Sequence, residues 1–239
     1  MNQKCVNLIT IFGYYEIPHC KKLSEIMRLH NIEDQKSLTP KLALNFLKEG
    51  NKRFVENLKA HSNLLEQVNE TKAGQFPFAI ILSCIDSRTS AELIFDQGLG
   101  DIFSTRIAGN VLNDDIIGSM EFACKLAGSK LIVVLGHTHC GAITGACHGT
   151  ELGHLTNLLA KVKPSIEHVK AHHQDLDIES KEAVDLVAFH NVEHTIGHIL
   201  EKSTVLKSMY ENGEIGIAGA FYKVETGEVD FVNEMIITK

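Results

Sequence analysis

The sequence predicts an α/β protein with a mainly parallel central sheet flanked by helices, and three observations carry this prediction. Residues 78–86, 101–110 and 130–137 form short, mostly apolar runs, which are typical of buried strands. A helical pattern from Asp114 to about Ala127 lies between the second run and the third. Strand, helix and strand therefore alternate, as they do in parallel sheets.

The composition indicates one compact domain. The 239 residues lie at the upper end of what a single hydrophobic core serves, and 44% of them are hydrophobic. The formal net charge of −7 and the lack of a dense Lys/Arg run argue against nucleic acid as a partner. No segment approaches the roughly 20 apolar residues that cross a membrane. We expect one domain over residues 36–239, preceded by an N-terminal extension of unknown role over residues 1–35.

Six cysteines bear on the compartment. The short apolar run within residues 1–16 is interrupted by Thr10 and Gly13, and no clear cleavage site follows it, so a secretory signal is not expected. Without such a signal, cysteines are better interpreted as thiols or metal ligands than as a disulfide framework. We therefore expect a cytoplasmic protein.

The remaining elements follow from periodicity. From Thr39, "TPKLALNFLKEGNKRFVENLKA" places apolar residues at helical spacing after a Thr-Pro start, and Gly50 predicts a strained or broken point. A second helical pattern runs from Ala183 through Leu206, with Gly213 as its stop. The last stretch, "IGIAGAFYKVETGEVDFV", alternates in polarity and turns at Thr226-Gly227, which predicts a hairpin at the sheet edge.

Soft metal ligands stand where two predicted strands end. Cys84 ends the first apolar run, and His137 and Cys140 follow the third. Ligands in parallel sheets bind at the carboxyl ends of strands. Thiolate and imidazole suit zinc, and a catalytic zinc takes three protein ligands and keeps a fourth position open. Taken alone, each of these residues could be an ordinary buried side chain, but together they supply the ligand count.

Asp86 and Arg88 follow Cys84 at intervals of two residues. In an extended segment, residues at this spacing point to the same side, so thiolate, carboxylate and guanidinium would converge. Two thiolates cancel the charge of a zinc ion, which then acidifies water less readily than a histidine-bound zinc does. An ionised Asp86, fixed by Arg88, would accept a hydrogen bond beside the metal. The alternative is a simple ion pair at a turn.

Other soft residues are expected to have no metal role. His139 falls off the face that His137 and Cys140 share in a helix-like turn, and Cys147 and His148 lie beyond it on the following helix. Cys124 lies on the apolar face of a predicted helix and is expected to pack there. Three histidines recur at helical spacing and could bind a metal: His190, His194 and His198. Neighbouring glutamates instead favour a solvent or subunit-contact face for them.

In chain order, these motifs resemble the β-class carbonic anhydrases. The match covers about residues 42–231 and includes "CIDSR" from Cys84, "RIAGN" from Arg106, "GSMEFA" from Gly118, "GHTHCGA" from Gly136 and "GAFYKVETGEVDF" from Gly219. The resemblance implies a Zn²⁺ enzyme for the reversible hydration of CO2 to bicarbonate and a proton by zinc-bound hydroxide. It also implies a homodimer or a dimer of dimers, in which an N-terminal helical arm packs on a partner subunit.

Site residues carry over from the family position by position. The resemblance implies that Cys84, His137 and Cys140 bind zinc and that Asp86 and Arg88 form the catalytic pair beside it, with Asp86 a possible fourth ligand in a closed state. It further implies that Gln75 reaches the substrate pocket of the partner subunit. The same resemblance implies that this pocket is lined by apolar side chains, those of Phe103, Ala108 and Phe122.

One departure from some bacterial members concerns regulation. Their second, non-catalytic bicarbonate site uses a Trp, an Arg and a Tyr. Arg106 and Tyr222 match the last two, but Ile81 stands at the Trp position and the chain has no Trp. We therefore do not expect that regulatory site here.

Two other functions fit parts of the same pattern. The same attack could hydrolyse a CO2 analogue such as carbonyl sulfide or carbon disulfide, since pocket shape and access decide between these substrates. A non-catalytic zinc module would result if Asp86 permanently closed the coordination shell. An open site should bind a sulfonamide or a small anion, and a closed one should not.

Overall fold

The computed structural model describes residues 32–59 and 63–237 of the chain. The elements in chain order are α1 (Ile32–Ser37), α2 (Pro40–Val55), α3 (Leu64–Thr71), β1 (Ala79–Ser83), α4 (Ala91–Ile94), β2 (Ile102–Arg106), the 3₁₀ turn η1 (Ala108–Asn110), α5 (Asp114–Glu121), the π-helical turn η2 (Phe122–Leu126), β3 (Leu131–His137), α6 (Gly141–Cys147), α7 (Gly153–Leu159), the 3₁₀ turn η3 (Ala160–Val162), α8 (Lys163–His172), α9 (Lys181–Lys202), α10 (Thr204–Glu211), β4 (Gly216–Tyr222) and β5 (Val229–Met235). No helix in these ranges is both long and apolar enough to cross a membrane.

A five-stranded sheet in the order β2-β1-β3-β4-β5 forms the centre of the molecule. The strands β2, β1, β3 and β4 pair in parallel, and β5 pairs antiparallel with β4 at the edge. The predicted α/β class and the C-terminal hairpin are therefore confirmed. The hairpin closes where Gly227 takes a φ of 81° and donates its N–H to the carbonyl of Lys223, as the Thr226-Gly227 turn signal indicated.

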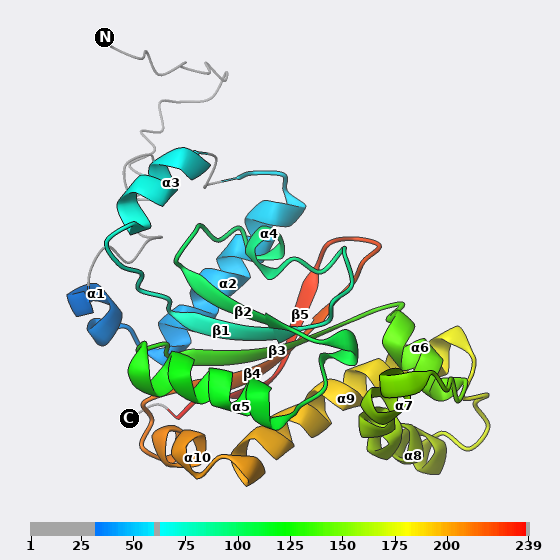
Figure 1. The fold of residues 1–239 in the computed structure, drawn as a ribbon. Helices are drawn as coiled ribbons and strands as arrows, with labels where there is room; N and C mark the ends of the chain where they lie inside the picture. Colours follow the sequence, from blue (N-terminus) through cyan, green and yellow to red (C-terminus); the bar gives the residue numbers. More distant parts are fainter. Residues whose placement is uncertain (1–31, 60–62, 238–239) are drawn as a thin grey trace, which may run out of the picture.

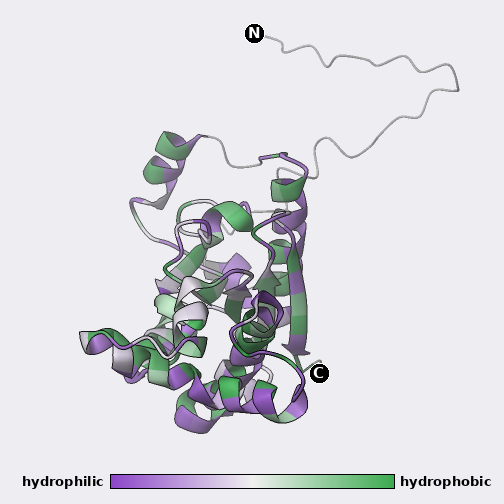
Figure 2. Cartoon of the chain, turned by 90° about the vertical axis from the view of Figure 1, so that its right-hand side faces the viewer, coloured by the Kyte–Doolittle hydropathy of each residue, from purple (hydrophilic) through white to green (hydrophobic). Residues whose placement is uncertain are grey.

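Helices cover both faces of this sheet, and each face has its own apolar core (Figure 1). Along β1, Ile80 and Leu82 belong to the core beneath α5, α9 and α10, while Ala79 and Ile81 belong to the core beneath α2 and α4. Coloured by hydropathy, the outer helices alternate between hydrophobic and hydrophilic residues, as helices with one buried face do (Figure 2). The central strands are buried on both sides, so they read as continuous apolar runs.

Helix α2 runs through Gly50 without a break, so the expected strain or break there was wrong. The helix starts as the Thr-Pro signal predicted, because the Thr39 side chain accepts a hydrogen bond from the Leu42 N–H at 3.3 Å. Gly50 is buried, and a Cβ at this position would lie 1.8 Å from the carbonyl oxygen of Phe95. The glycine therefore allows α2 to approach the end of α4 closely.

The single helix expected from Ala183 through Leu206 is in fact two helices. The first, α9, ends at Lys202, and Ser203 leaves the helical conformation with φ −111° and ψ 106°. Its side chain accepts a hydrogen bond from the Leu206 N–H at 3.0 Å and so caps α10. Because apolar residues keep their spacing across the break, periodicity alone could not reveal it.

The N-terminal part of the chain is only partly described. Residues 1–31, most of the predicted extension, lie outside the described residues. The expected boundary after residue 35 falls within α1, where the buried Gln35 donates its Nε2 to the carbonyl oxygens of Pro77 and Ala127 at 2.9 and 2.8 Å. The early helix α2 buries Ala43 and Leu44 against its own sheet.

Candidate metal centre and active site

The metal centre lies where two neighbouring strands end. Strands β1 and β3 pair in parallel with Ser83 opposite Leu135, so their carboxyl ends lie side by side. Cys84 follows β1 directly, and His137 is the last residue of β3. Cys140 comes after a short turn and precedes α6. Three soft ligands, far apart in the sequence, therefore meet at one edge of the sheet.

The three side chains are arranged as zinc ligands would be. Cys84, His137 and Cys140 are 3%, 1% and 1% exposed, and their ligand atoms all lie within 4.8 Å of one another. The two sulfur atoms are 3.9 Å apart. Tetrahedral zinc with Zn–S bonds of about 2.3 Å places two sulfurs about 3.8 Å apart, whereas a disulfide needs about 2.05 Å. The pair is thus spaced for a shared metal rather than for a disulfide.

One nitrogen of His137 points to the same conclusion. Its Nδ1 lies 2.8 Å from the Thr138 carbonyl oxygen and donates to it, which leaves Nε2 as the basic nitrogen. That Nε2 is buried and has no hydrogen-bond partner. A buried polar atom without a partner costs about 1–3 kcal/mol, so the site needs a further group. A zinc ion coordinated by Nε2 would supply it, and the residues present fit this metal.

The two metal-binding thiols differ in pKa. Hydrogen bonds from Cys140 and from the Gly109 N–H, the latter at 3.3 Å, lower the pKa of Cys84 to about 4 despite its burial. The pKa of Cys140 is raised, because its thiol is hydrogen-bonded to Cys84, is buried, and stands beside the negative charge of Cys84. A divalent cation between the sulfurs would compensate both negative charges.

Asp86 and Arg88 pair beside this centre. Arg88 donates Nε to Oδ1 of Asp86 at 2.9 Å, Nη2 to Oδ2 at 2.8 Å, and its backbone N–H to Oδ1 at 3.0 Å. These bonds hold the pKa of the Asp86 carboxyl well below its usual range, so it stays ionised. Asp86 is not among the residues whose ligand atoms converge on the metal position.

The route to this pairing differs from the one expected. The segment from Cys84 to Arg88 is not extended, because β1 ends at Ser83 and the chain turns, with the Thr89 N–H bonded to the Asp86 carbonyl at 3.0 Å. The turn brings these side chains together.

Arg106 supports this turn, a contact that the sequence did not reveal. It donates a hydrogen bond from Nε to the Cys84 carbonyl at 3.0 Å and one from Nη2 to the Asp86 carbonyl at 2.5 Å. Its place in the "RIAGN" motif was the available signal.

The turn between His137 and Cys140 is held from outside. His139 takes a φ of 54°, so the turn is not the helix-like one expected. Its N–H donates to Oδ1 of Asp185 at 2.9 Å, and its ring contacts Glu225, which also accepts the Thr138 hydroxyl at 2.8 Å. His139 therefore points away from the metal position. No local sequence pattern indicated these contacts, because Asp185 and Glu225 lie 46 and 86 residues away from His139.

The expected pocket residues are only partly together in one chain. Phe103 and Phe122 meet edge to face with centroids 6.2 Å apart, and both line an open cleft of about 700 Å³ between β2 and α5. Ala108 lies in η1, directly before the Gly109 that contacts Cys84, and does not line this cleft. Gln75 is exposed in the segment before β1.

Histidines form a row away from this centre. The rings of His168 and His190 stack with centroids 3.7 Å apart, and the row continues to His172 at 4.1 Å and through His194 to His198 at 6.4 and 4.3 Å. Burial lowers the pKa values of His190 and His194. The expected solvent face of α9 is thus packed in part against α8. In the described part of the chain, only the residues around Cys84 bring three soft ligand atoms together.

The remaining thiols lie apart from the metal centre. Cys124 is 3% exposed in the apolar core, as expected, and burial raises its pKa to about 12. Cys147 ends α6, and burial raises its pKa to about 11. High pKa values keep both thiols protonated and poorly suited to bind metal at neutral pH.

An α/β fold with a two-cysteine, one-histidine centre at its strand ends defines a zinc metalloprotein. The family model described as carbonic anhydrase matches residues 79–229. The chain therefore belongs to the β-class carbonic anhydrase family, and it is a zinc-dependent enzyme of that kind.

Individual relatives agree with this assignment. Carbonic anhydrase 2 of Mycobacterium tuberculosis is 35% identical over 194 residues, which cover 79% of this chain and 90% of the relative. The carbonic anhydrase of Mycolicibacterium smegmatis is 33% identical over 197 residues, covering 80% and 92%. Among solved structures, the β-carbonic anhydrase of Aspergillus fumigatus superposes with a TM-score of 0.64 at 29% identity, covering 81% of this chain and 90% of its own.

Proposed function

We propose that this enzyme hydrates CO2 reversibly to bicarbonate and a proton at the centre formed by Cys84, His137 and Cys140, with Asp86 and Arg88 as its catalytic pair. One observation carries the proposal: three buried ligand atoms converge within 4.8 Å, one of them the unpartnered Nε2 of His137. The carboxylate next to them is held by Arg88 and leaves a fourth coordination position open.

Each side chain of the site has a distinct task. Zinc at such a centre acts as a Lewis acid and lowers the pKa of a water molecule. Cys84 and Cys140 hold the ion as thiolates, and their two negative charges offset its charge. Asp86, which is ionised and can only accept, takes a hydrogen bond from the attacking water and so orients its lone pair toward CO2. Arg88 fixes both oxygens of that carboxylate.

The rest of the site keeps this geometry in place. Arg106 donates to two carbonyl groups of the turn that carries Cys84 and Asp86. Asp185 and Glu225 hold the turn that carries His137 and Cys140. We therefore assign these three residues positioning roles, since none of them is among the converging ligands. These hydrogen bonds favour a single geometry of the metal ligands.

The substrate pocket is proposed to be completed by a second copy of the chain, as a homodimer or a dimer of dimers. Phe122 is 54% exposed beside Phe103, and α3 exposes Leu64 and Leu65 by 59% and 79%. Exposed apolar groups of this size favour burial against a partner. Gln75, Phe103, Ala108 and Phe122 would then line one apolar pocket, which suits an uncharged gas. Analytical ultracentrifugation tests this: a monomer at micromolar concentration would contradict it.

A cytoplasmic location is part of the same proposal. Each of the four cysteines in the described ranges is a free thiol. Free thiols, two of them needed as metal ligands, are typical of a reducing compartment. Fractionation of cells that produce the protein tests this, and recovery outside the cytoplasmic fraction would contradict it.

Rate and binding measurements distinguish CO2 hydration from the two alternatives, hydrolysis of a CO2 analogue and a non-catalytic zinc module. Stopped-flow hydration of CO2 by the zinc-loaded protein at about pH 8.5 is expected to be fast, and sulfide release from carbonyl sulfide and carbon disulfide is expected to be slow. Dominant sulfide release would contradict the proposed substrate. A purely structural zinc needs a fourth protein ligand, yet Asp86 is bonded to Arg88. Failure to bind a sulfonamide would contradict the open position.

A further inference from the structure

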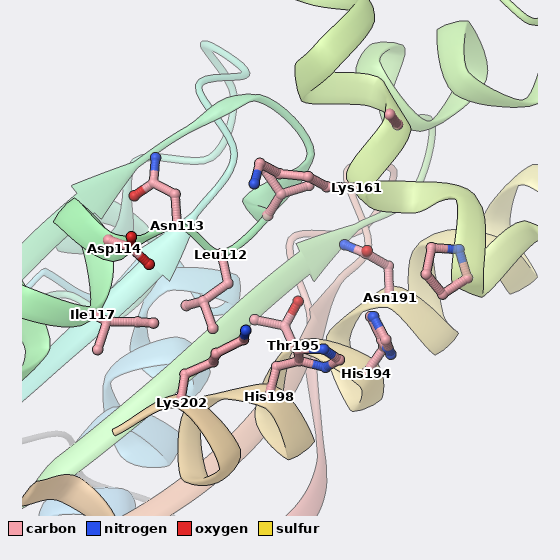
Figure 3. A pocket seen from close by; sticks show the side chains of 13 residues that line it. Leu112, Asn113, Asp114, Ile117, Lys161, Asn191, His194, Thr195, His198 and Lys202 are labelled. Carbon is pink, nitrogen blue, oxygen red and sulfur yellow. The ribbon is translucent and has the colours of Figure 1, made fainter. Parts of the chain in front are cut away.

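A second cavity lies away from the metal centre, between the start of α5, η3 and the middle of α9 (Figure 3). Its volume is about 310 Å³, which is at the small end of the range for ligand-binding pockets. The thirteen lining residues combine an apolar wall, two buried polar groups and a charged rim. The apolar wall consists of Val111, Leu112, Ile117, Ala160 and Pro164.

Two buried polar side chains of α9 form the inner part of the cavity. Asn191 and Thr195 are 1% and 3% exposed, and both line it. The Asn191 amide donates Nδ2 to the Gly109 carbonyl at 2.9 Å. The two side chains therefore give the otherwise apolar wall of the cavity a polar part.

Positive charge dominates the rim. Lys161 comes from η3 and Lys202 from the end of α9, and neither forms an ion pair with a described residue. His194 and His198 lie on the same side of the cavity as Lys202 (Figure 3). Asp114 is the one carboxylate among the described lining residues. Two ammonium groups against one carboxylate leave the cavity attractive to anions.

We propose that this cavity binds a small organic anion of the short-chain dicarboxylate class. Two separate lysines fit two carboxylates, and the apolar wall fits the methylene chain between them. An inorganic anion would leave that wall unused. A larger ligand such as a nucleotide exceeds the volume, and the lining offers imidazole rings but no Phe, Tyr or Trp to stack a base.

The cavity is connected to the metal centre through two hydrogen bonds. Asn191 holds the carbonyl of Gly109, and the N–H of Gly109 donates to Sγ of Cys84 at 3.3 Å. Gly109 has a φ of 67°, a conformation that its neighbours maintain. A ligand that contacts Asn191 therefore shifts Gly109 and, through it, the sulfur of Cys84. Binding in the cavity then changes the rate of CO2 hydration. This site lies beyond the proposed function, and binding to it is measured independently of activity.

Calorimetric titration of the zinc-loaded protein with glutarate at low ionic strength tests the proposal. A saturating sulfonamide blocks the metal centre, so that only binding elsewhere is measured. Glutarate is expected to bind, whereas its neutral analogue glutaramide is not, because the lysines recognise charge. The double variant Lys161→Gln/Lys202→Gln should weaken binding at least about tenfold. The charge-matched control Lys181→Gln/Lys207→Gln, whose residues are exposed and outside the lining, should bind as the wild type does.

Several results would overturn this inference. Equal binding by glutaramide would exclude recognition of charge, and equal binding by the lysine double variant would place glutarate elsewhere. Tighter binding of inorganic phosphate than of glutarate would exclude an organic anion. Glutarate should also change kcat for CO2 hydration in the wild type and much less in the lysine double variant. The same change in both would place its action at the metal centre. Circular dichroism and zinc content check that both double variants fold.

Discussion

Replacing Arg88 by Gln separates the position of the Asp86 carboxylate from its charge. The substitution removes two of the three hydrogen bonds that Arg88 makes to Asp86, those from Nε and Nη2, and keeps the one from the backbone N–H. The Arg88 side chain is 50% exposed, so the pair stabilises the fold by at most about 1 kcal/mol. The cost to catalysis is larger, because a misplaced acceptor beside the reacting atoms loses about 100-fold in kcat/KM.

The pH dependence makes this test specific. Arg88 depresses the pKa of the folded Asp86 below its ordinary value of 3.8. The stability that the pair contributes is therefore present above about pH 4 and lost as the pH falls below it. In Arg88→Gln the pKa of Asp86 rises toward 3.8, yet the carboxylate is still ionised at neutral pH. The defect is geometric, so raising the pH should not rescue it.

Stopped-flow hydration over about pH 6.5–9 measures this effect. Arg88→Lys keeps the charge and loses the planar fork, so we expect the order wild type, then Arg88→Lys, then Arg88→Gln. Zinc content and thermal unfolding are measured for each variant to exclude loss of metal or fold. If zinc-loaded Arg88→Gln kept kcat/KM within about twofold of the wild type, or recovered it at high pH, the role given to the pair would be refuted.

The remaining predictions concern stability. Gly50→Ala should destabilise the fold by about 2–4 kcal/mol, because its Cβ would lie 1.8 Å from the Phe95 carbonyl oxygen. Gly197→Ala in α9 should stabilise the fold by about 0.5–1 kcal/mol, because nothing lies within 4 Å of the added Cβ. Urea unfolding measures both variants, and the same change in the free energy of unfolding for both would contradict these predictions. Burial and the His168 charge lower the pKa of the folded His190, so the unfolded chain binds the proton first and stability falls as the pH drops below 6.5. His190→Asn should reduce that fall between about pH 7.5 and 5.5, and an unchanged slope would argue against it.

The strands and their ends could be predicted from the sequence because burial on both faces leaves a simple mark. The runs that form β1 and β3 are mostly apolar, so their ends, and with them Cys84 and His137, could be located. Parallel pairing then places those ends together. The family resemblance added roles to residues that polarity alone could not interpret, as for Asp86 and Arg88.

What the sequence did not reveal depends on contacts between distant segments. Gly50 looked like a helix break, because only the Phe95 backbone beside it explains the missing side chain. Ser203 ended a helix through its own capping hydrogen bond, which apolar spacing does not record. Asp185 supports the ligand turn across 46 residues, a distance over which local patterns carry no signal.

The cavity beside α9 likewise depends on contacts between distant segments and could not be predicted from the sequence. Its charged and buried members come from η3, α5 and α9, and each looks like an ordinary surface lysine or helix residue in the sequence. Asn191 lies in the interior and is bonded to Gly109, and no local pattern in the sequence indicates either contact. Only the folded chain brings these groups together.

The X-ray absorption spectrum at the zinc edge tests the central claim most directly. For the zinc-loaded wild type we predict two sulfur ligands at about 2.3 Å and two nitrogen or oxygen ligands at about 2.0–2.1 Å. Cys84→Ser should lose one sulfur, whereas Cys124→Ser, which replaces a buried core thiol outside the cluster, should keep both. A wild-type spectrum with four sulfurs or none, or an unchanged sulfur count in Cys84→Ser, would contradict the proposed centre.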